Sequence, residues 1–110
     1  MGENDNITLI TDENFESEVE KSEKTVLIDF YADWCAPCRL ISSMLDKIAE
    51  KFQDQLKVVK VDTENSPTVA SKFKITGLPT LILFKDGVEK KRFVGVQKQS
   101  QIELNISELV

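Results

Sequence analysis

A nearly continuous apolar run from Val26 to Tyr31 is the feature that most constrains the fold of this chain. The run holds a single charged residue, Asp29. Such a run is typical of a strand that is buried on both faces, as in a parallel sheet covered by helices. Apolar residues then recur with helical spacing from Leu40 to Phe52, and Leu56 to Val61 again resembles a buried strand. The centre of the chain is therefore predicted to be a strand–helix–strand unit.

Further elements are predicted on both sides of this unit. Thr11 and Asp12 offer capping oxygens for one helix, and Ser66 caps another with Pro67 at its first position. The flanking elements are expected at 7–10 (strand), 11–21 (helix), 66–73 (helix), 79–84 (strand), 85–87 (hairpin turn), 89–94 (strand) and around Ile102, Ile106 and Leu109 (helix). The order βαβαβαββα predicts an α/β fold with a mixed central sheet and helices on both faces.

The size of the chain suits one domain. It has 110 residues, of which 41% are hydrophobic and 30% are charged, as is usual for a folded globule. We expect residues 1–110 to form a single domain, with residues 1–6 as a flexible amino-terminal segment.

Charge and hydropathy limit the classes of partner. The net charge is −5, and the longest basic run is Lys90-Lys91-Arg92, so no basic cluster of the kind that neutralises nucleic-acid phosphates is present. No apolar run approaches the ~20 residues that a membrane span requires, and the acidic start of the chain lacks a signal-peptide pattern. We expect a cytoplasmic protein that binds neither nucleic acid nor membrane.

The two cysteines of the chain, Cys35 and Cys38, lie two residues apart between a predicted strand and a predicted helix. Unpaired amides at a helix start favour a thiolate, which is the nucleophile in disulfide exchange. One helical turn separates the two sulfurs, so Cys38 could resolve a mixed disulfide on Cys35. A structural disulfide or a metal site is the alternative, but so short a loop stabilises little, and zinc takes four ligands in a chain without histidine.

Three further residues have both a structural and a functional interpretation. Asp29 is either exposed near a strand end or a buried acid with a raised pKa. Lys60, taken from the residues alone, is expected to point to solvent, because lysine is seldom buried without a partner. Trp34 is either a core aromatic or part of a binding surface beside Cys35.

The stretch from Asp29 to Arg39, DFYADWCAPCR, closely resembles the active-site signature of the thioredoxin family. The resemblance extends from about Ile7 to Leu109. It also includes Lys60, Gly95 and the motifs Thr76-Gly77-Leu78-Pro79-Thr80 and Phe84-Lys85-Asp86-Gly87.

The resemblance implies roles for these residues. Asp29 would accept the proton of Cys38, through water, with Lys60 as its charge partner. Pro79 would be cis and face the cysteines. The substrate-binding surface would comprise Trp34, Ala36, Pro37, Thr76, Gly77, Leu78, Pro79 and Gly95, with Gly95 leaving room for an extended substrate segment.

The chain departs from the family pattern at three positions. Ala36 replaces the usual glycine between the cysteines, and Arg39 stands where lysine is common. Ser43 replaces a proline that kinks the helix in many members, so we expect a straighter helix here.

The resemblance implies an enzyme that reduces protein disulfides by exchange at a redox-active Cys35–Cys38 pair. The chain lacks the glycine-rich fingerprint of nucleotide cofactors, so we expect no bound cofactor or metal, a monomer, and electrons from an external thioredoxin reductase. Two rivals stay open: a disulfide-forming oxidant or isomerase, and a thioredoxin-fold binding module in which exchange is incidental.

Overall fold

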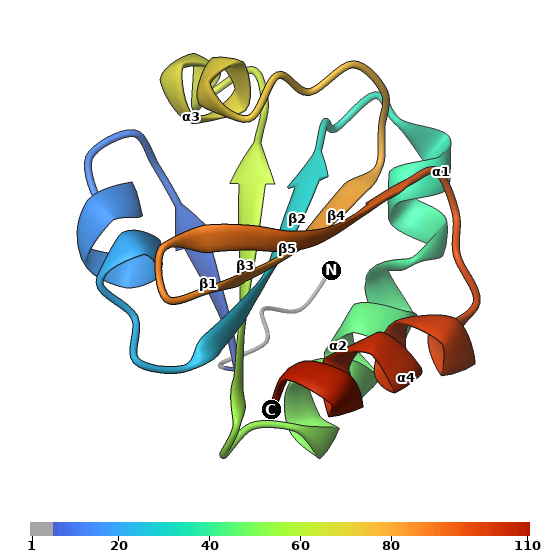
Figure 1. The fold of residues 1–110 in the computed structure, drawn as a ribbon. Helices are drawn as coiled ribbons and strands as arrows, with labels where there is room; N and C mark the ends of the chain where they lie inside the picture. Colours follow the sequence, from blue (N-terminus) through green and yellow to red (C-terminus); the bar gives the residue numbers. More distant parts are fainter. Residues whose placement is uncertain (1–5) are drawn as a thin grey trace.

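The protein forms one mixed sheet with helices on both faces, as predicted. The computed structural model describes residues 6–110, so most of the segment expected to be flexible lies outside the described residues. The elements (Figure 1) are β1 (Ile7–Ile10), η1 (Glu16–Glu20), β2 (Thr25–Tyr31), α1 (Ala36–Leu40), α2 (Ser42–Lys51), β3 (Leu56–Asp62), α3 (Pro67–Lys72), β4 (Thr80–Lys85), β5 (Val88–Val94) and α4 (Gln99–Leu109). The first helix is a single π-helical turn.

Within residues 6–110, the sheet has five strands in the order β1-β3-β2-β4-β5. Strand β3 pairs in parallel with both β1 and β2, whereas β4 is antiparallel to β2 and to β5. The two parallel pairings require crossovers, and the helices η1, α1 and α2 supply them. Strand β2 is therefore central, and its carboxyl end lies in the middle of the sheet rather than at an edge.

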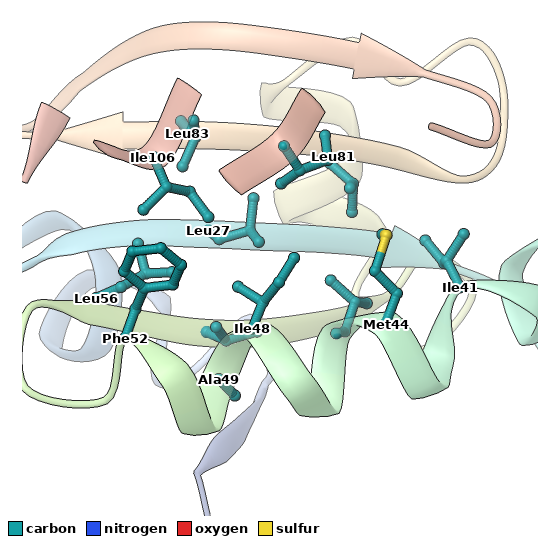
Figure 2. Packing of buried hydrophobic residues seen from close by; sticks show 13 residues of the cluster. Leu27, Ile41, Met44, Ile48, Ala49, Phe52, Leu56, Leu81, Leu83 and Ile106 are labelled. Carbon is teal, nitrogen blue, oxygen red and sulfur yellow. The ribbon is translucent and has the colours of Figure 1, made fainter. Parts of the chain in front are cut away.

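The alternation of side chains along β2 builds one core on each face of the sheet. Leu27 packs with α2 and α4, where Ile48 and Ile106 are fully buried (Figure 2). Ile28 faces the opposite way and packs with an aromatic group around Phe73. Because both faces of β2 are covered, its apolar run needs no polar alternation.

The hairpin between β4 and β5 follows from its turn residues. Asp86 and Gly87 both have positive φ, 55° and 79°, as a two-residue turn matched to the twist of a hairpin requires. A register shift between Leu83 and Phe84 marks a bulge in the pairing with β5. The turn was predicted correctly, but the bulge was not.

The helix after the cysteines, expected to be straighter than in members with a proline, is not continuous. The helix is interrupted at Ile41, whose φ of −92° and ψ of −2° separate α1 from α2. The Ile41 side chain is buried in the core beside Met44 and Leu45. The interruption therefore occurs without a proline, with Ser43 inside the second helix.

Two capping predictions also need correction. The Asp12 carboxylate does not cap the helix that follows it; it accepts hydrogen bonds from the amides of Thr68 and Val69 at the start of α3. Ser66 donates its hydroxyl to the carbonyl of Ile10 and makes no side-chain cap. Thr11 and Asn14 exchange hydrogen bonds in the turn that precedes η1, but η1 itself starts after Phe15 without a side-chain cap.

Candidate active site

The two cysteines lie where β2 passes into α1. Cys35 is the N-cap residue of α1, with extended backbone angles, and Pro37 occupies the first turn. The Cys38 amide donates a hydrogen bond to the Cys35 sulfur at 3.2 Å. This contact places a hydrogen-bond donor on the sulfur of Cys35, which favours its negatively charged form when the pair is reduced.

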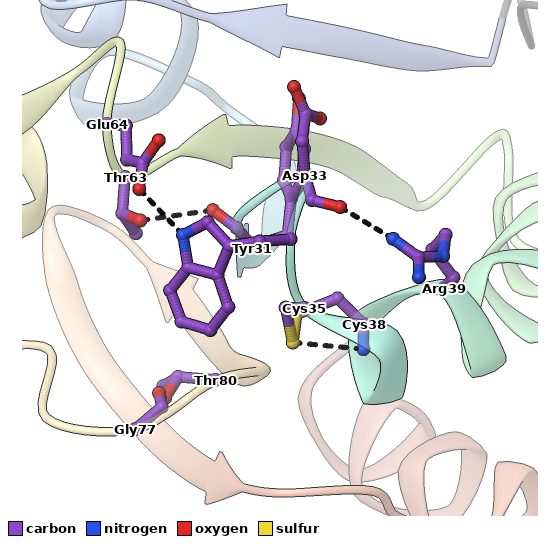
Figure 3. Close-up of a disulfide and its surroundings, with 10 residues drawn as sticks. Tyr31, Asp33, Cys35, Cys38, Arg39, Thr63, Glu64, Gly77 and Thr80 are labelled. Atoms are coloured by element: carbon purple, nitrogen blue, oxygen red, sulfur yellow. Dashed lines mark hydrogen bonds between the residues drawn. A yellow bond between two sulfur atoms is a disulfide. The ribbon is translucent and has the colours of Figure 1, made fainter.

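Cys35 and Cys38 form a disulfide in the structure, with their Cα atoms 5.3 Å apart (Figure 3). Both are buried and pack against Ala32, Tyr31 and Leu78. A spacing of two residues on the first helical turn thus places the two Cα atoms within the range that a disulfide spans. The arrangement can cycle between a dithiol and a disulfide.

Asp29 is a buried carboxyl group in the interior of β2, with a relative exposure of 2%. Its Oδ1 atom has no hydrogen-bond partner among residues 6–110. Burial raises the pKa of Asp29 to about 7, and the positive charge of Lys60 partly opposes that rise. A carboxyl group with this pKa can both accept and return a proton near neutral pH.

Lys60 lies beside Asp29 on the neighbouring strand, since the two residues are register partners in β2 and β3. Its ammonium group sits over the ring of Tyr31, 4.5 Å from the ring centroid. This cation–π contact holds the lysine at the site end of the sheet. Burial and the nearby carboxylates of Asp62, Asp33 and Asp29 raise the pKa of the Tyr31 hydroxyl.

The loop before β4 faces the cysteines from the other side. The Leu78–Pro79 peptide bond is cis, and Leu78 packs against the cysteine pair. The Gly95 amide donates to the Pro79 carbonyl at 2.8 Å, which ties the end of β5 to this loop. Gly95 has a φ of 89°, and this left-handed conformation favours glycine.

Glycine is needed at position 77 for a different reason, because the surroundings leave little space for a side chain. The Thr80 hydroxyl donates a hydrogen bond to the Gly77 carbonyl at 2.6 Å. A Cβ atom on Gly77 would lie only 3.2 Å from a methyl group of Val94. The loop therefore approaches β5 more closely than a residue with a side chain easily permits.

Trp34 is a surface residue, with a relative exposure of 67%. Its indole N–H donates to the Glu64 carboxylate at 2.6 Å (Figure 3). Beside it lies a hollow of about 270 Å³ lined by Trp34, Thr63, Ala70, Ile75, Thr76, Gly77 and Leu78. The structure thus brings Trp34 together with three of the four predicted loop residues, all but Pro79. Ala36 and Pro37 are exposed next to Cys35.

Sequence reasoning missed the loop after β3. Thr63 bonds through both its amide and its hydroxyl to the Tyr31 carbonyl, and the buried Asp62 carboxylate accepts from the amides of Glu64 and Asn65. These bonds hold Glu64 where it meets Trp34. A usable signal existed, because the carboxyl ends of the parallel strands β2 and β3 meet at one edge of the sheet.

Other parts of the surface offer less chemistry. Two larger hollows, each of about 470 Å³, are lined mainly by residues distant from the cysteines. Within residues 6–110, no group of three or more His, Cys, Asp or Glu side chains could hold a metal ion. In the same part of the chain, no helix has the length and apolar character of a membrane span.

Comparison with known proteins agrees with the geometry. The family model described as Thioredoxin matches residues 6–108. The chain is 36% identical over 104 residues to "Thioredoxin" of Porphyra purpurea, covering 94% of this chain and 97% of that protein. It is 48% identical over 86 residues to "Thioredoxin 1" of Synechococcus elongatus, covering 78% and 80%. It is also 45% identical over 92 residues to "Thioredoxin Y1, chloroplastic" of Arabidopsis thaliana, covering 84% and 54%. A family match over nearly the whole described chain, joined to a cysteine pair able to form a disulfide, shows that this protein belongs to the thioredoxin family of thiol–disulfide oxidoreductases.

Proposed function

We propose that the protein works as a reductant of disulfides in protein substrates, with Cys35 as the attacking thiol and Cys38 as the resolving thiol. The observation that carries this proposal is the position of Cys35 as an N-cap residue whose sulfur accepts the Cys38 amide. That amide stabilises negative charge on one sulfur of the pair. Cys35 therefore has the more stable thiolate.

The reaction takes place in two exchanges. The Cys35 thiolate attacks one sulfur of the substrate disulfide; a new S–S bond forms, and the other substrate sulfur leaves as a thiolate that takes up a proton. Cys38 then loses its proton and attacks the Cys35 sulfur, which releases the second substrate thiol. The substrate gains two electrons, and Cys35 and Cys38 are left as the disulfide seen in the structure.

Asp29 is proposed as the proton acceptor for Cys38, through water. Its burial and its pKa of about 7 support this role, as does the free hydrogen-bonding capacity of its Oδ1 atom. Lys60 is proposed as the positive charge that keeps part of the Asp29 population ionised near neutral pH.

The substrate segment is proposed to lie across the loop at Thr76, Gly77, Leu78 and Pro79, next to Gly95. The hollow between this loop and Trp34 supports such a path. Ala36 and Pro37 would contact the segment beside the reacting sulfur. An extended segment can bind there through its backbone, so the enzyme need not read a fixed substrate sequence.

The wider setting follows from this chemistry. We propose a single domain over residues 1–110 that acts as a monomer in the cytoplasm, where the reducing environment keeps the pair in its active dithiol form. A thioredoxin reductase would reduce the Cys35–Cys38 disulfide back to the dithiol. The proposed reaction involves no cofactor, nucleic acid or membrane. The chloroplastic relative makes localisation of the tagged full-length protein in its own cell the direct test of the compartment.

The reduction potential of the Cys35–Cys38 pair tests the direction of the reaction. Titration against thiol–disulfide buffers, followed by Trp34 fluorescence, is expected to give a value near about −270 mV. A value between about −180 and −120 mV would identify an isomerase or oxidant instead. Absence of a reversible two-electron transition would reject the redox role and favour a binding module.

Replacement of Cys35 by serine separates catalysis from binding. If the biological activity needs exchange, the Cys35→Ser variant loses it while retaining its fold. If that variant keeps the activity, the protein acts as a binding module and the exchange is incidental.

A further inference from the structure

The basic run at 90–92 has no part in the proposed chemistry, yet it lies on a strand that leads to the site. It belongs to β5, the edge strand of the sheet. All but one of the β5 residues are exposed. Residues 72–98 hold seven Lys or Arg and two Asp or Glu, whereas residues 6–34 hold two and eight. A chain with a net charge of −5 thus concentrates positive charge next to this edge.

Local contacts neutralise only part of this charge. Arg92 is bound by the Glu89 carboxylate, and its guanidinium also donates to the Phe73 carbonyl. Lys72 pairs with Glu20. Within residues 6–110, neither Lys90 nor Lys91 forms an ion pair. These two exposed lysines are therefore the uncompensated charges of the β5 edge.

The geometry of β5 places Lys91 and Arg92 on opposite faces of the strand. Lys91 is the register partner of Leu83, which faces α4, while Arg92 is the partner of Ile82, which faces α3. Lys90 has no partner on β4 because it occupies the bulge. Lysine and a bulge on an edge strand are also a known protection against strand pairing. Recognition at this edge must then come from side-chain charge rather than from an added strand.

The edge continues directly into the candidate site. Val94 touches the loop at Gly77, and the next residue, Gly95, bonds to Pro79. Figure 1 shows β5 leading to the connection that passes towards α4. Three to four residues of extended strand separate the lysines from Val94, or about 10–13 Å. Exposed charges farther apart than the Debye length of about 10 Å at 0.1 M salt are largely screened, so the lysines act on substrate carboxylates that lie beside β5 itself.

We infer that the β5 edge is a docking surface for acidic segments of the disulfide-bearing substrate, with Lys90 and Lys91 attracting carboxylates next to its reactive cystine. The inference rests on the proposed reductase function and names a substrate class for the same site. The opposite flank carries the Glu64 carboxylate beside Trp34, while Arg39 donates to the Asp33 carbonyl. The site is thus electrically asymmetric, and a substrate with carboxylates on its β5 side is oriented by that asymmetry.

The test compares two synthetic peptides of equal length, each with one disulfide. In the acidic peptide the disulfide is flanked by Asp and Glu, and in the basic peptide it is flanked by Lys. Bis(2-hydroxyethyl) disulfide serves as an uncharged probe. The pre-reduced full-length protein is mixed with each in 0.1 M salt, and the second-order rate of thiol release is measured. The readout is the rate for each peptide divided by the rate for the uncharged probe.

The Lys90→Glu/Lys91→Glu variant is expected to lower the ratio for the acidic peptide roughly fivefold to tenfold and to raise it for the basic peptide. The milder Lys90→Gln/Lys91→Gln variant should move both ratios in the same directions by less. The matched control is Lys21→Glu/Lys47→Glu, which makes the same change in net charge with exposed lysines outside β5. The difference between the β5 variant and the control should shrink at about 0.5 M salt.

Equal shifts in the β5 variant and the control would overturn the inference, because only net charge would then matter. Unchanged ratios in the β5 variant would overturn it as well and leave the lysines with edge protection alone. A parent protein that fails to reduce the uncharged probe would instead reject the proposed function. The two failures are therefore distinguishable.

Discussion

Strands β2 and β5 each have seven residues in the same sheet, yet they occupy opposite environments. Strand β2 is central and almost wholly buried, and its one charged residue is Asp29. Strand β5 is at the edge, and four of its residues are charged and exposed. Burial gives the carboxyl group of Asp29 a pKa of about 7, whereas Glu89 on β5 has its pKa lowered by the hydrogen bond from Arg92. The same carboxyl chemistry therefore gives a group that titrates near neutral pH in one strand and a surface charge in the other.

The largest expected effect is at the end of β2. The Cys35→Ser variant should reduce substrate turnover to less than roughly a thousandth of the parent rate, because no other residue supplies the nucleophile. The Cys38→Ser variant should instead accumulate a mixed disulfide that gel analysis without reductant detects. If Cys35→Ser instead accumulated the mixed disulfide and Cys38→Ser abolished turnover without it, the attacking thiol would be Cys38.

The next largest contrast between β2 and β5 is expected in how much each strand's side-chain packing contributes to the free energy of unfolding. Leu27→Ala in β2 removes a fully buried side chain and should lower the free energy of unfolding by about 2–5 kcal/mol. Val88→Ala in β5 removes a side chain that is 52% exposed, and should change it by no more than about 0.5 kcal/mol. Urea denaturation measures both, and equal losses would contradict the contrast in burial.

Asp29→Asn should stabilise the protein at high pH. Between the ordinary pKa of 3.8 and the folded value of about 7, the unfolded chain is ionised while the folded protein keeps its proton, so parent stability falls as pH rises through this window. The variant cannot ionise. It should therefore be more stable than the parent at pH 8, by at most about 4 kcal/mol, and no more stable near pH 3. Denaturation at both pH values checks the sign.

The same Asp29→Asn variant should slow release of the mixed disulfide at pH 7. General base catalysis commonly contributes 10²-fold or more, and we expect a loss of roughly tenfold or greater. The difference in release rate between the variant and the parent should become smaller towards pH 9, because a thiol with a pKa of about 8.5 ionises there without a base. Unchanged rates from pH 6 to pH 9 would remove Asp29 from the proton path.

The smallest pH-dependent effect is expected at Glu89, with a sign opposite to that at Asp29. Its pKa is lowered by the hydrogen bond from Arg92, so its contribution to stability is present above the unfolded pKa and is lost as pH falls through the folded value. The site is partly exposed and screened by solvent. Glu89→Gln should therefore lower stability at pH 7 by less than about 1 kcal/mol and have no effect near pH 2. A larger loss than that of Leu27→Ala would reverse the comparison.

Much of the fold could be predicted because its determinants are local in the chain. The hydrophobic pattern of 26–31 and 40–52 identified a buried strand and its following helix, and Asp86-Gly87 identified the hairpin. The spacing of Cys35 and Cys38 identified the redox pair. Each of these patterns spans fewer than about 15 residues, a range over which backbone geometry dictates what side chains meet.

Other features could not be predicted because they join distant segments. Asp12 caps a helix that begins at Pro67, and Glu64 binds Trp34 across 30 positions. The interruption at Ile41 coincides with burial of its side chain in the core. Each depends on which surfaces pack together, and no local propensity contains that information.

The sequence by itself determined the order of the elements, the family and the residues able to carry exchange chemistry, because periodicity and spacing encode these directly. Only the tertiary structure decided the pKa of Asp29, the seating of Trp34 against Glu64 and the isolation of Lys90 and Lys91 on the sheet edge. These are properties of environment. A charge acquires its free energy from the solvent it loses and the partners it meets, and both are known only once the chain is folded.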